Sequence, residues 1–224
     1  MTINFLRFGI VGAAALMTVS PALAQDEASS FSAGVTAGTL GIGPEVGFRP
    51  SPMFGVRGSA SFFNVNADFD VDDIDYKGKV KLESYGAMAD FYPFQGGLRI
   101  SGGFRINKNR VNVVATPTTS VTVGNVTYTP AQIGTLSGHV KTNEFAPVVT
   151  LGYAGGLTKG IKFGIDAGVM FQGNPEAQSL RATGSLANNA AFLTELERER
   201  VKLNDDIDGY KYYPVVQLSL FYAF

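Results

Sequence analysis

The sequence predicts an all-β fold: a closed eight-stranded antiparallel transmembrane β-barrel of a bacterial outer membrane, with an amphipathic helix in its last outer loop. Three observations predict this fold. Stretches of about ten residues alternate between apolar and small or polar side chains, as membrane-spanning strands do. Turn-forming residues end each stretch. The chain is also rich in glycine (27 residues) and in aromatic rings (17 Phe and 9 Tyr), and it contains no cysteine.

The first 24 residues predict a signal peptide. Arg7 precedes an apolar run over residues 8–19, and Ala22-Leu23-Ala24 has the small-x-small pattern that a signal peptidase cleaves. The alternative is a membrane anchor, but the run is shorter than the roughly 20 apolar residues that a spanning helix needs. We therefore expect residues 1–24 to be removed and residues 25–224 to form one outer-membrane β-barrel domain. The net charge of −1 shows no basic excess, so no nucleic-acid partner is expected.

The alternation is clearest over residues 161–172. Ile161, Phe163 and Ile165 fall on one face, while Lys162 and Asp166 fall on the other with two glycines. A soluble sandwich also alternates, but its second face is rich in Lys, Glu and Thr. Here that face is mostly Gly, Ser and Ala, which suits a narrow lumen. The same pattern recurs over residues 31–36, 54–62, 98–107, 145–153 and 210–224.

Aromatic residues stand near the ends of these stretches, as girdles at two membrane interfaces require. Short turns at 49–52, 93–97 and 157–160 alternate with longer polar connections at about 66–80, 114–138 and 173–209. This asymmetry predicts short periplasmic turns and long outer loops. A tight connection near 38–41 completes the even count of strands. In the stretch 80–92 the apolar residues change face, and we expect a β-bulge near Gly86 to reconcile them.

The C-terminal segment Leu218-Ser219-Leu220-Phe221-Tyr222-Ala223-Phe224 resembles the signal that outer-membrane barrels present to the barrel assembly machinery, with Tyr222 and Phe224 as its aromatic residues. The chain as a whole resembles the small barrels related to the outer membrane protein A transmembrane domain and to the outer membrane protein W type. Residues 38–48, 89–94 and 102–109 resemble a proteobacterial outer-membrane family without an assigned function. The resemblance implies an outer-membrane barrel surrounded by lipid, and no particular chemistry.

Isolated charges of both signs lie on the faces expected to point inward. Because an unpaired buried charge is costly, we expect opposite charges to pair across the lumen and to fill it. The alternative is a narrow conducting or ligand path lined by the arginines. The residues of this expected lumen charge network are Glu45, Arg49, Arg57, Arg99, Arg105, Lys162 and Asp166.

The first long loop carries five aspartates. Oxygen ligands at alternate positions suit Ca²⁺, so weak cation binding is one interpretation. The run lacks the glycine and the glutamate of an EF-hand loop, and its interleaved apolar residues favour a hairpin that projects past the membrane. Three lysines on the returning arm, at 77, 79 and 81, are expected to pair with the acids across the strands. The aspartates are Asp68, Asp70, Asp72, Asp73 and Asp75.

The connection at 114–138, the third outer loop when the tight turn near 38–41 is counted, contains a hairpin signal, because Gly124-Asn125 separates two short β-prone runs. The last loop differs, since Leu186 to Leu203 has the periodicity of an amphipathic helix, with Asn188 or Thr194 as its cap. Such a helix beside the barrel mouth is expected to act as a lid over the lumen; docking on lipid headgroups or on a partner are the alternatives. A small amphipathic ligand at the mouth would then border Leu193, Leu196 and the third outer loop.

Enzyme signals are weak. His139 is the only histidine, and Ser137 lies two residues before it on the same face of a strand. Outer-membrane deacylases carry a histidine and a serine in the order His-x-Ser, together with further polar residues. This chain does not match that pattern. We expect a non-enzymatic barrel without catalytic residues, cofactor or dedicated metal site, with a structural or surface-interaction role carried by its outer loops. Alternatives are a barrel that binds or passes a small amphipathic ligand and a lipid A-modifying enzyme.

Overall fold

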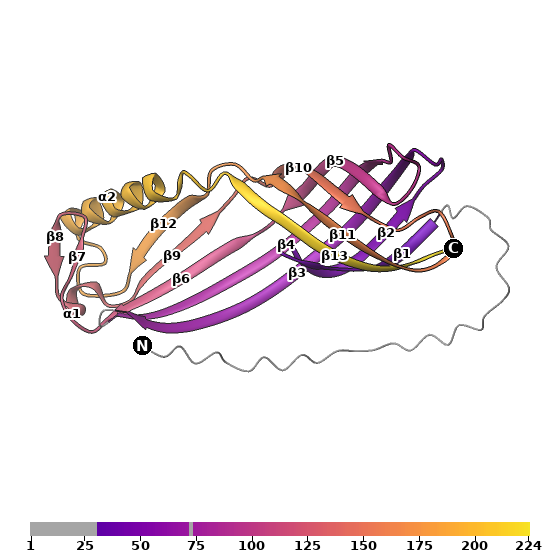
Figure 1. Cartoon of the computed structure of the whole chain (residues 1–224). Coiled ribbons are helices and arrows are strands. Elements are labelled where there is room, and N and C mark those ends of the chain that lie inside the picture. Colours follow the sequence, from indigo (N-terminus) through magenta and orange to yellow (C-terminus); the bar gives the residue numbers. More distant parts are fainter. Residues whose placement is uncertain (1–30, 72–73) are drawn as a thin grey trace.

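The structure, a computed structural model, describes residues 31–71 and 74–224, so the expected signal peptide lies outside the described residues. Figure 1 shows two parts: a ring of long strands, and beyond one end of it a layered unit of shorter strands and helices, which we call the head. Among the described residues, no helix combines the length and the apolar character needed to cross a membrane.

Eight strands form the ring, and each pairs antiparallel with two neighbours. Because β1 pairs with β13 and β4 pairs with β5, the sheet closes on itself. The closed eight-stranded antiparallel barrel expected from the alternation is therefore confirmed. In order around the ring, the strands are β1 (Phe31–Gly38), β2 (Gly41–Phe48), β3 (Phe54–Val71), β4 (Ile74–Phe91), β5 (Leu98–Asn107), β10 (Phe145–Tyr153), β11 (Gly160–Phe171) and β13 (Tyr212–Ala223).

The barrel presents a belt of apolar side chains outward. Aromatic pairs border this belt at both ends: Phe31 with Phe48 near the short turns, and Phe104 with Phe145 near the long loops. On β3, Phe54 belongs to the first border and the Phe62 ring to the second. The stretch between these two rings matches the roughly 9–11 residues that a tilted strand needs to cross the hydrocarbon. The belt is therefore built to face lipid.

The head begins where β4 changes its partner. Residues 84–91 of β4 pair with β5 inside the ring, whereas residues 74–81 pair with β6. β6 pairs with β9 and β9 with β12, so the long β3–β4 hairpin continues as an open sheet. The added elements are β6 (Arg110–Pro117), β7 (Val121–Val123), β8 (Val126–Tyr128), α1 (Pro130–Ile133), β9 (Leu136–Lys141), β12 (Glu176–Ala182) and α2 (Ala190–Ile207).

β4 runs through this transition without a bulge. Its register with β3 is continuous from Phe91 to Ile74, so the bulge expected near Gly86 is wrong. The apolar residues change face because the outer side of β4 faces lipid in the barrel and water in the head. Inside the membrane the outward residues such as Tyr85 are apolar, whereas in the head the outward residues are Lys77 and Lys79, and Tyr76 points inward. One regular strand thus carries two opposite patterns, one for lipid and one for water.

The β7–β8 hairpin forms as its turn signal predicts, with Gly124 at a positive φ of 63°. The turn is attached to α2, because Glu199 accepts a hydrogen bond from the Gly124 N–H (3.1 Å) and Glu195 accepts one from the Asn125 N–H (3.0 Å). Beneath them lies the head core, whose buried residues are Val123, Tyr128, Ile133, Phe192 and Leu196.

The helix α2 also covers the edge strand β12. Asn204 accepts a hydrogen bond from the Ala177 N–H (2.7 Å), and Arg200 donates to the Ala177 carbonyl (3.2 Å). The free backbone groups of an exposed edge strand can pair with another chain. The two side chains of α2 occupy such groups on β12 and so block this pairing. The helix starts later than its periodicity suggested. Asn189, in extended conformation, caps it by accepting from the N–H groups of Ala191 and Phe192, whereas Asn188 and Thr194 were the expected caps.

The expectation that the helix forms a lid over the lumen is wrong. Its main contacts are with β12 and β7 in the head, and Figure 1 shows it away from the ring. The periodic face that suggested a lid packs on the head core instead, through Phe192 and Leu196.

A lysine placed in the belt tests its contact with lipid. Ile165, half-exposed in the middle of β11, is expected to cost about 2–4 kcal/mol of unfolding free energy when replaced by Lys, because a charge there leaves water. Val126→Lys in the head is the control, since Val126 is similarly exposed but lies in water. Urea unfolding of barrels folded in vesicles measures both. Equal costs for the two variants would contradict the placement of the belt.

Candidate functional site

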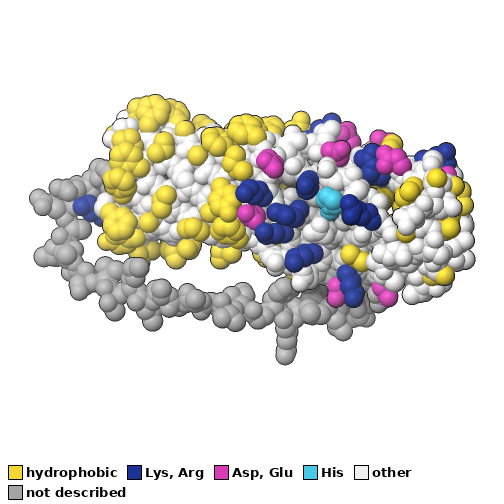
Figure 2. Space-filling model, turned by 180° about the vertical axis from the view of Figure 1, so that it is seen from behind, with side chains coloured by type: hydrophobic (Ala, Val, Ile, Leu, Met, Phe, Trp, Pro, Cys, Tyr) yellow, Lys and Arg dark blue, Asp and Glu magenta, His cyan; other side chains and the backbone are white. Residues whose placement is uncertain are grey.

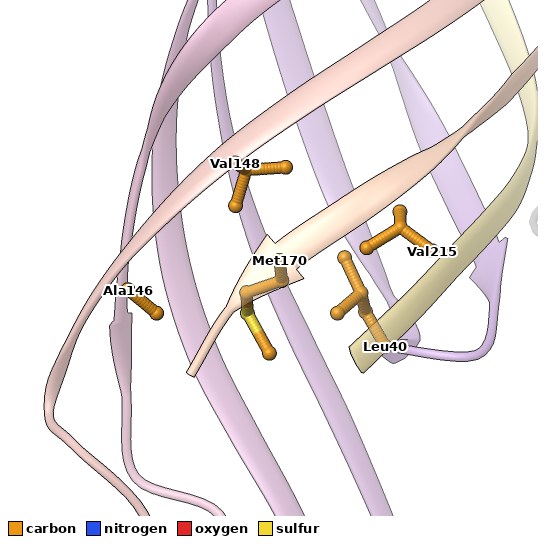
Figure 3. Close-up of a cluster of buried hydrophobic side chains, with 5 residues drawn as sticks. All are labelled: Leu40, Ala146, Val148, Met170 and Val215. Carbon is orange, nitrogen blue, oxygen red and sulfur yellow. The ribbon is translucent and has the colours of Figure 1, made fainter. Parts of the chain in front are cut away.

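The lumen is closed at its long-loop end by an apolar cluster, which we call the apolar plug (Figure 3). Its side chains converge from the β1–β2 turn and from three neighbouring strands. Met88 and Tyr213 pack against it. The plug consists of Leu40, Ala146, Val148, Met170 and Val215.

A local network holds Leu40 in the plug. The N–H of Thr39 donates to the Val216 carbonyl, its hydroxyl donates to the Pro214 carbonyl (2.9 Å), and its carbonyl accepts from the Tyr213 hydroxyl (2.5 Å). The turn is therefore fastened to β13 and directs Leu40 over the lumen, where it is 3% exposed. Sequence reasoning located this turn but not its plug. The signal was present as a single large apolar side chain in a glycine-rich turn.

Deeper in the lumen, arginines and carboxylates form a central charge network. The Arg57 Nε lies 2.8 Å from Asp90 Oδ2, and its Nη1 lies 3.2 Å from both Glu45 Oε2 and Asp166 Oδ2. Its Nη2 donates to the Ser101 hydroxyl at 3.2 Å. The guanidinium of Arg57, which stands on β3, thus binds side chains from β2, β4, β5 and β11.

Arg99 completes the network. Its Nε and Nη2 donate to the two oxygens of Asp166 at 3.0 and 2.5 Å, a bidentate geometry, and its Nη1 lies 3.8 Å from Asp90. Ser101 donates to Asp90 at 2.6 Å. Arg99, Asp90 and Asp166 are each at most 5% exposed. Charges this buried are tolerated because each is paired and hydrogen-bonded.

Arg105 lies apart from this network and is held by hydroxyl groups. Its three nitrogens donate to the side chains of Ser84 (3.0 Å), Ser59 (3.0 Å) and Ser61 (3.1 Å). Within the described residues, no carboxylate lies at ion-pair distance from Arg105. Gly86 leaves room for it, since a Cβ there would lie 2.7 Å from Arg105 Nη1.

Two further cations lie at the short-turn end. Arg49 stacks on the Tyr92 ring, 3.5 Å from its centre, and donates to the carbonyls of Gly96 (3.1 Å), Gln95 (3.2 Å) and Pro52. It therefore ties two turns together. Lys162 donates to the Thr158 hydroxyl.

The structure thus brings four of the seven expected lumen charges into contact, namely Glu45, Arg57, Arg99 and Asp166. It places Arg49, Arg105 and Lys162 outside the central network. Sequence reasoning missed Asp90 and Ser101. Asp90 alternates with Met88 and Gly86 on the inward face of β4, but the change of pattern along that strand concealed its direction.

Little space remains inside the barrel. One cavity of about 50 Å³ adjoins Arg49, Tyr92 and Arg99, and another of about 30 Å³ lies between the plug and the charge network. Cavities of this size hold no more than a few water molecules. The lumen of the described barrel is therefore filled from the plug to the short turns.

A larger cavity of about 370 Å³ lies in the head, between the inner face of the sheet and the layer formed by β7, α1 and α2. Its lining is mostly apolar, with Val113, Ala115 and Leu136 from the sheet and Leu203 from α2. The two leucines expected to border a ligand do not line it, since Leu196 lies in the head core and Leu193 is exposed. The cavity is thus away from the barrel mouth, under the C-terminal half of the helix.

The acidic loop forms the end of the β3–β4 hairpin. Asp68 lies opposite Lys77, and Asp70 opposite Asp75, while residues 72–73 lie outside the described residues. Lys79 and Lys81 face asparagines across the strands, and Lys81 pairs instead with Glu83 at 2.6 Å. The described residues contain no group of three or more acidic, His or Cys side chains placed to hold a metal ion.

The remaining candidates lie on strands. Tyr222 and Phe224 stand at the end of β13, with ring centres 5.1 Å apart, and the Phe224 N–H donates to the Phe31 carbonyl (2.9 Å). Ser137 and His139 share the outer face of β9 in the head. In the described part of the chain, no hydrogen bond joins these two side chains to each other or to a carboxylate.

Comparison with solved structures gives similar folds. The crystal structure of Acinetobacter baumannii CarO2 matches with 20% identity and a TM-score of 0.59, covering 89% of this chain and 100% of that one. Acinetobacter baumannii CarO matches with 19% identity and a TM-score of 0.56, covering 86% and 97%. A major outer membrane protein from Thermus thermophilus has 13% identity and a TM-score of 0.46 over 88% and 100%.

At these identities the likeness is one of fold. No protein-family model matches the chain, and the search of curated proteins gives no match either. The closed ring and its apolar belt, together with the two CarO neighbours, define the class: the protein is a β-barrel of the bacterial outer membrane. The resemblance to small outer-membrane barrels thus holds for the fold.

Removing one carboxylate from the charge network tests its contribution to stability. Asp166→Leu leaves Arg99 without its bidentate partner, and we expect a loss of about 3–5 kcal/mol in unfolding free energy. Arg99→Met/Asp166→Leu is expected to lose less than the single variant, because the two charges leave together.

Lys162→Met, near the short turns, is the control and is expected to change stability by about 0.5 kcal/mol or less. Urea titration followed by heat-modifiable gel mobility measures all three variants. A double variant that is as unstable as Asp166→Leu, or less stable, would contradict the pairing.

Proposed function

We propose that the protein is a non-enzymatic outer-membrane barrel whose filled lumen serves as an anchor, and whose function is carried by the head. The observation that supports this most is the occupation of the lumen by the apolar plug, the central charge network and Arg49. By the rule of short periplasmic turns, the head stands on the outer side of the membrane. There it is presented to the surroundings of the cell.

The head has the properties of an interaction module. It has its own apolar core, and α2 covers the edge of its sheet. Its helix carries charged pairs such as the exposed Glu197 with the partly buried Arg200, whose guanidinium lowers the pKa of the Glu197 carboxyl through a hydrogen bond. Most connections in compact domains are short, whereas the connections on this side of the barrel are long and form a folded outer unit. A folded unit in this position supports a surface-interaction role.

Assembly belongs to the same proposal. We propose that Tyr222 and Phe224 present the terminal aromatic signal to the barrel assembly machinery before the barrel closes. Their strand is the last in sequence, and it completes the ring by pairing with both β1 and β11. The acidic loop then serves as the water-exposed end of the β3–β4 hairpin.

The filled lumen predicts that purified, folded protein gives no steady single-channel currents in planar bilayers. Leu40→Gly/Met170→Ala removes part of the apolar plug, and we expect it to remain closed because the central charge network still spans the lumen. A protein-free bilayer is the negative control, and a known large porin is the positive control. Steady current steps from the wild-type protein would replace the anchor by a pore.

A second candidate function is binding of a small apolar or amphipathic ligand by the head. The observation that favours it is the head cavity, whose volume of about 370 Å³ lies within the range of ligand pockets, about 300–1,000 Å³. The mostly apolar lining suits an acyl chain or a similar group, and Glu199 at its border suits a polar end.

Filling the cavity tests this candidate. Ala115→Phe is expected to weaken the binding of dansyl-labelled undecanol, whose hydroxyl can donate to Glu199, about tenfold or more, because the ring occupies the space of the ligand. Ala191→Phe, on the exposed side of α2, is the matched control and should bind like the wild-type protein. Fluorescence titration gives the three affinities. Equal binding by the two variants would remove the cavity as the site.

A further inference from the structure

A polar pocket of about 300 Å³ opens at the junction between the barrel and the head. It lies between the β5–β6 turn and the residues that join β9 to β10, where the strands of the ring separate from the strands of the head. Three cations line it, Lys108, Arg110 and Lys141, together with one carboxylate, Glu144. We call it the junction pocket.

The three cations of the junction pocket outnumber its one carboxylate, Glu144. Among the described residues, none of the three cations has a carboxylate within ion-pair distance. Arg110 pairs in register with Lys81 on one side and with Lys141 on the other, so three cations form a row across three strands. Within the described chain, Lys81 alone among these three has an ion-pair partner, Glu83. Glu176 of β12 lies opposite Lys141 at the end of the row, outside the pocket lining, and its carboxylate accepts a hydrogen bond from Gln178 at 3.2 Å. The pocket therefore keeps an excess of positive charge.

Hydrogen bonds between neighbouring segments hold the walls of the junction pocket in place. Asn107, which is 2% exposed, donates to the Thr142 hydroxyl at 2.8 Å and accepts from the Asn109 N–H at 3.1 Å. The Asn109 side chain in turn accepts from the Glu83 N–H at 2.9 Å. These bonds join β4, the β5–β6 turn and the segment after β9, and they fix the backbone that carries the three cations.

The height of the pocket relative to the membrane identifies the kind of ligand. The stacked pair Phe104–Phe145, with ring centres 5.4 Å apart, marks the upper border of the apolar belt. Ile106 pairs with Phe145, and Lys108 follows two residues later, roughly 7 Å further along the strand. Figure 2 shows Lys and Arg side chains gathered directly beyond the yellow belt and around the cyan side chain, His139. This is the level of lipid headgroups.

We propose that the junction pocket binds the phosphate group of a membrane lipid headgroup. Arg and Lys recognise phosphate through charge-assisted hydrogen bonds, and Arg110 supplies a planar fork for two oxygens. The lipid is the source because the apolar belt directly below holds its acyl chains, while the three cations lie where its headgroup stands. Lys79 and His139, in the next row outward, extend the basic face above the pocket. This inference does not depend on the function of the head cavity.

Titration of the full-length protein in detergent by calorimetry tests the proposal, with dihexanoyl phosphatidic acid as the probe. Dihexanoylglycerol lacks the phosphate, and inorganic phosphate lacks the chains. Arg110→Gln/Lys141→Gln is expected to weaken phosphatidic acid binding about thirtyfold, because each cation near a membrane surface contributes about a factor of five. Lys77→Gln/Arg181→Gln removes the same charge from the same sheet face outside the pocket, and is expected to change affinity less than about threefold.

All four substituted side chains are exposed, and unchanged heat-modifiable mobility verifies that the variants fold. Binding of phosphatidic acid that is lost in the pocket variant and kept in the control supports the proposal. Equal losses in both variants would assign binding to the general charge of the sheet face and overturn the pocket. Inorganic phosphate that binds as tightly as phosphatidic acid would overturn the lipid as its source, and binding of dihexanoylglycerol with equal affinity would overturn the phosphate as the recognised group. Absence of phosphatidic acid binding to the wild-type protein would overturn the site altogether.

Discussion

Every backbone N–H and C=O group inside hydrocarbon must find its partner within the protein, and most of this structure follows from that requirement. A sheet satisfies it only by closing, which β1 and β13 achieve together with β4 and β5. A ring of eight strands leaves an interior about as wide as the side chains that point into it. Any charge there is removed from water, so the arginines of the lumen are held by carboxylates and hydroxyls. The filled lumen is thus a consequence of a small closed ring.

Beyond the membrane the same sheet no longer needs to close. β4 exchanges β5 for β6 and the sheet opens, with its apolar face now turned inward toward α2 and β7. An open sheet has an edge, and here Arg200 and Asn204 of α2 occupy the backbone groups of Ala177 on that edge. The inversion of the apolar pattern and the capped edge have one cause, the change of solvent from lipid to water.

The sequence predicts what is periodic or local. Alternation located the strands of the ring, because lipid contact repeats every second residue, and Gly124-Asn125 located the short hairpin, because its turn is local. The head sheet was not predicted, since β6, β9 and β12 pair across long connections that leave no periodic signal. Leu40 and Asp90 were missed for related reasons. The Leu40 side chain points over the lumen because Thr39 is bonded to β13, a strand far away in the sequence. The Asp90 side chain points inward because the register of β4 with β3 is uninterrupted. The four lumen charges that meet were identifiable because they lie on regular strands.

The β3–β4 hairpin connects the two parts, and its base carries members of the charge network. Arg57 on β3 binds Asp90 on β4 and reaches Asp166 on β11 across the lumen. The hairpin is therefore fixed to the opposite wall of the barrel before it leaves the membrane. At its exit, Glu83 of β4 is bonded to Asn109 and Lys81, so the first row of the head is tied to the β5–β6 turn. A head held in this way keeps the junction pocket at one height above the belt, which is what recognition of a headgroup requires.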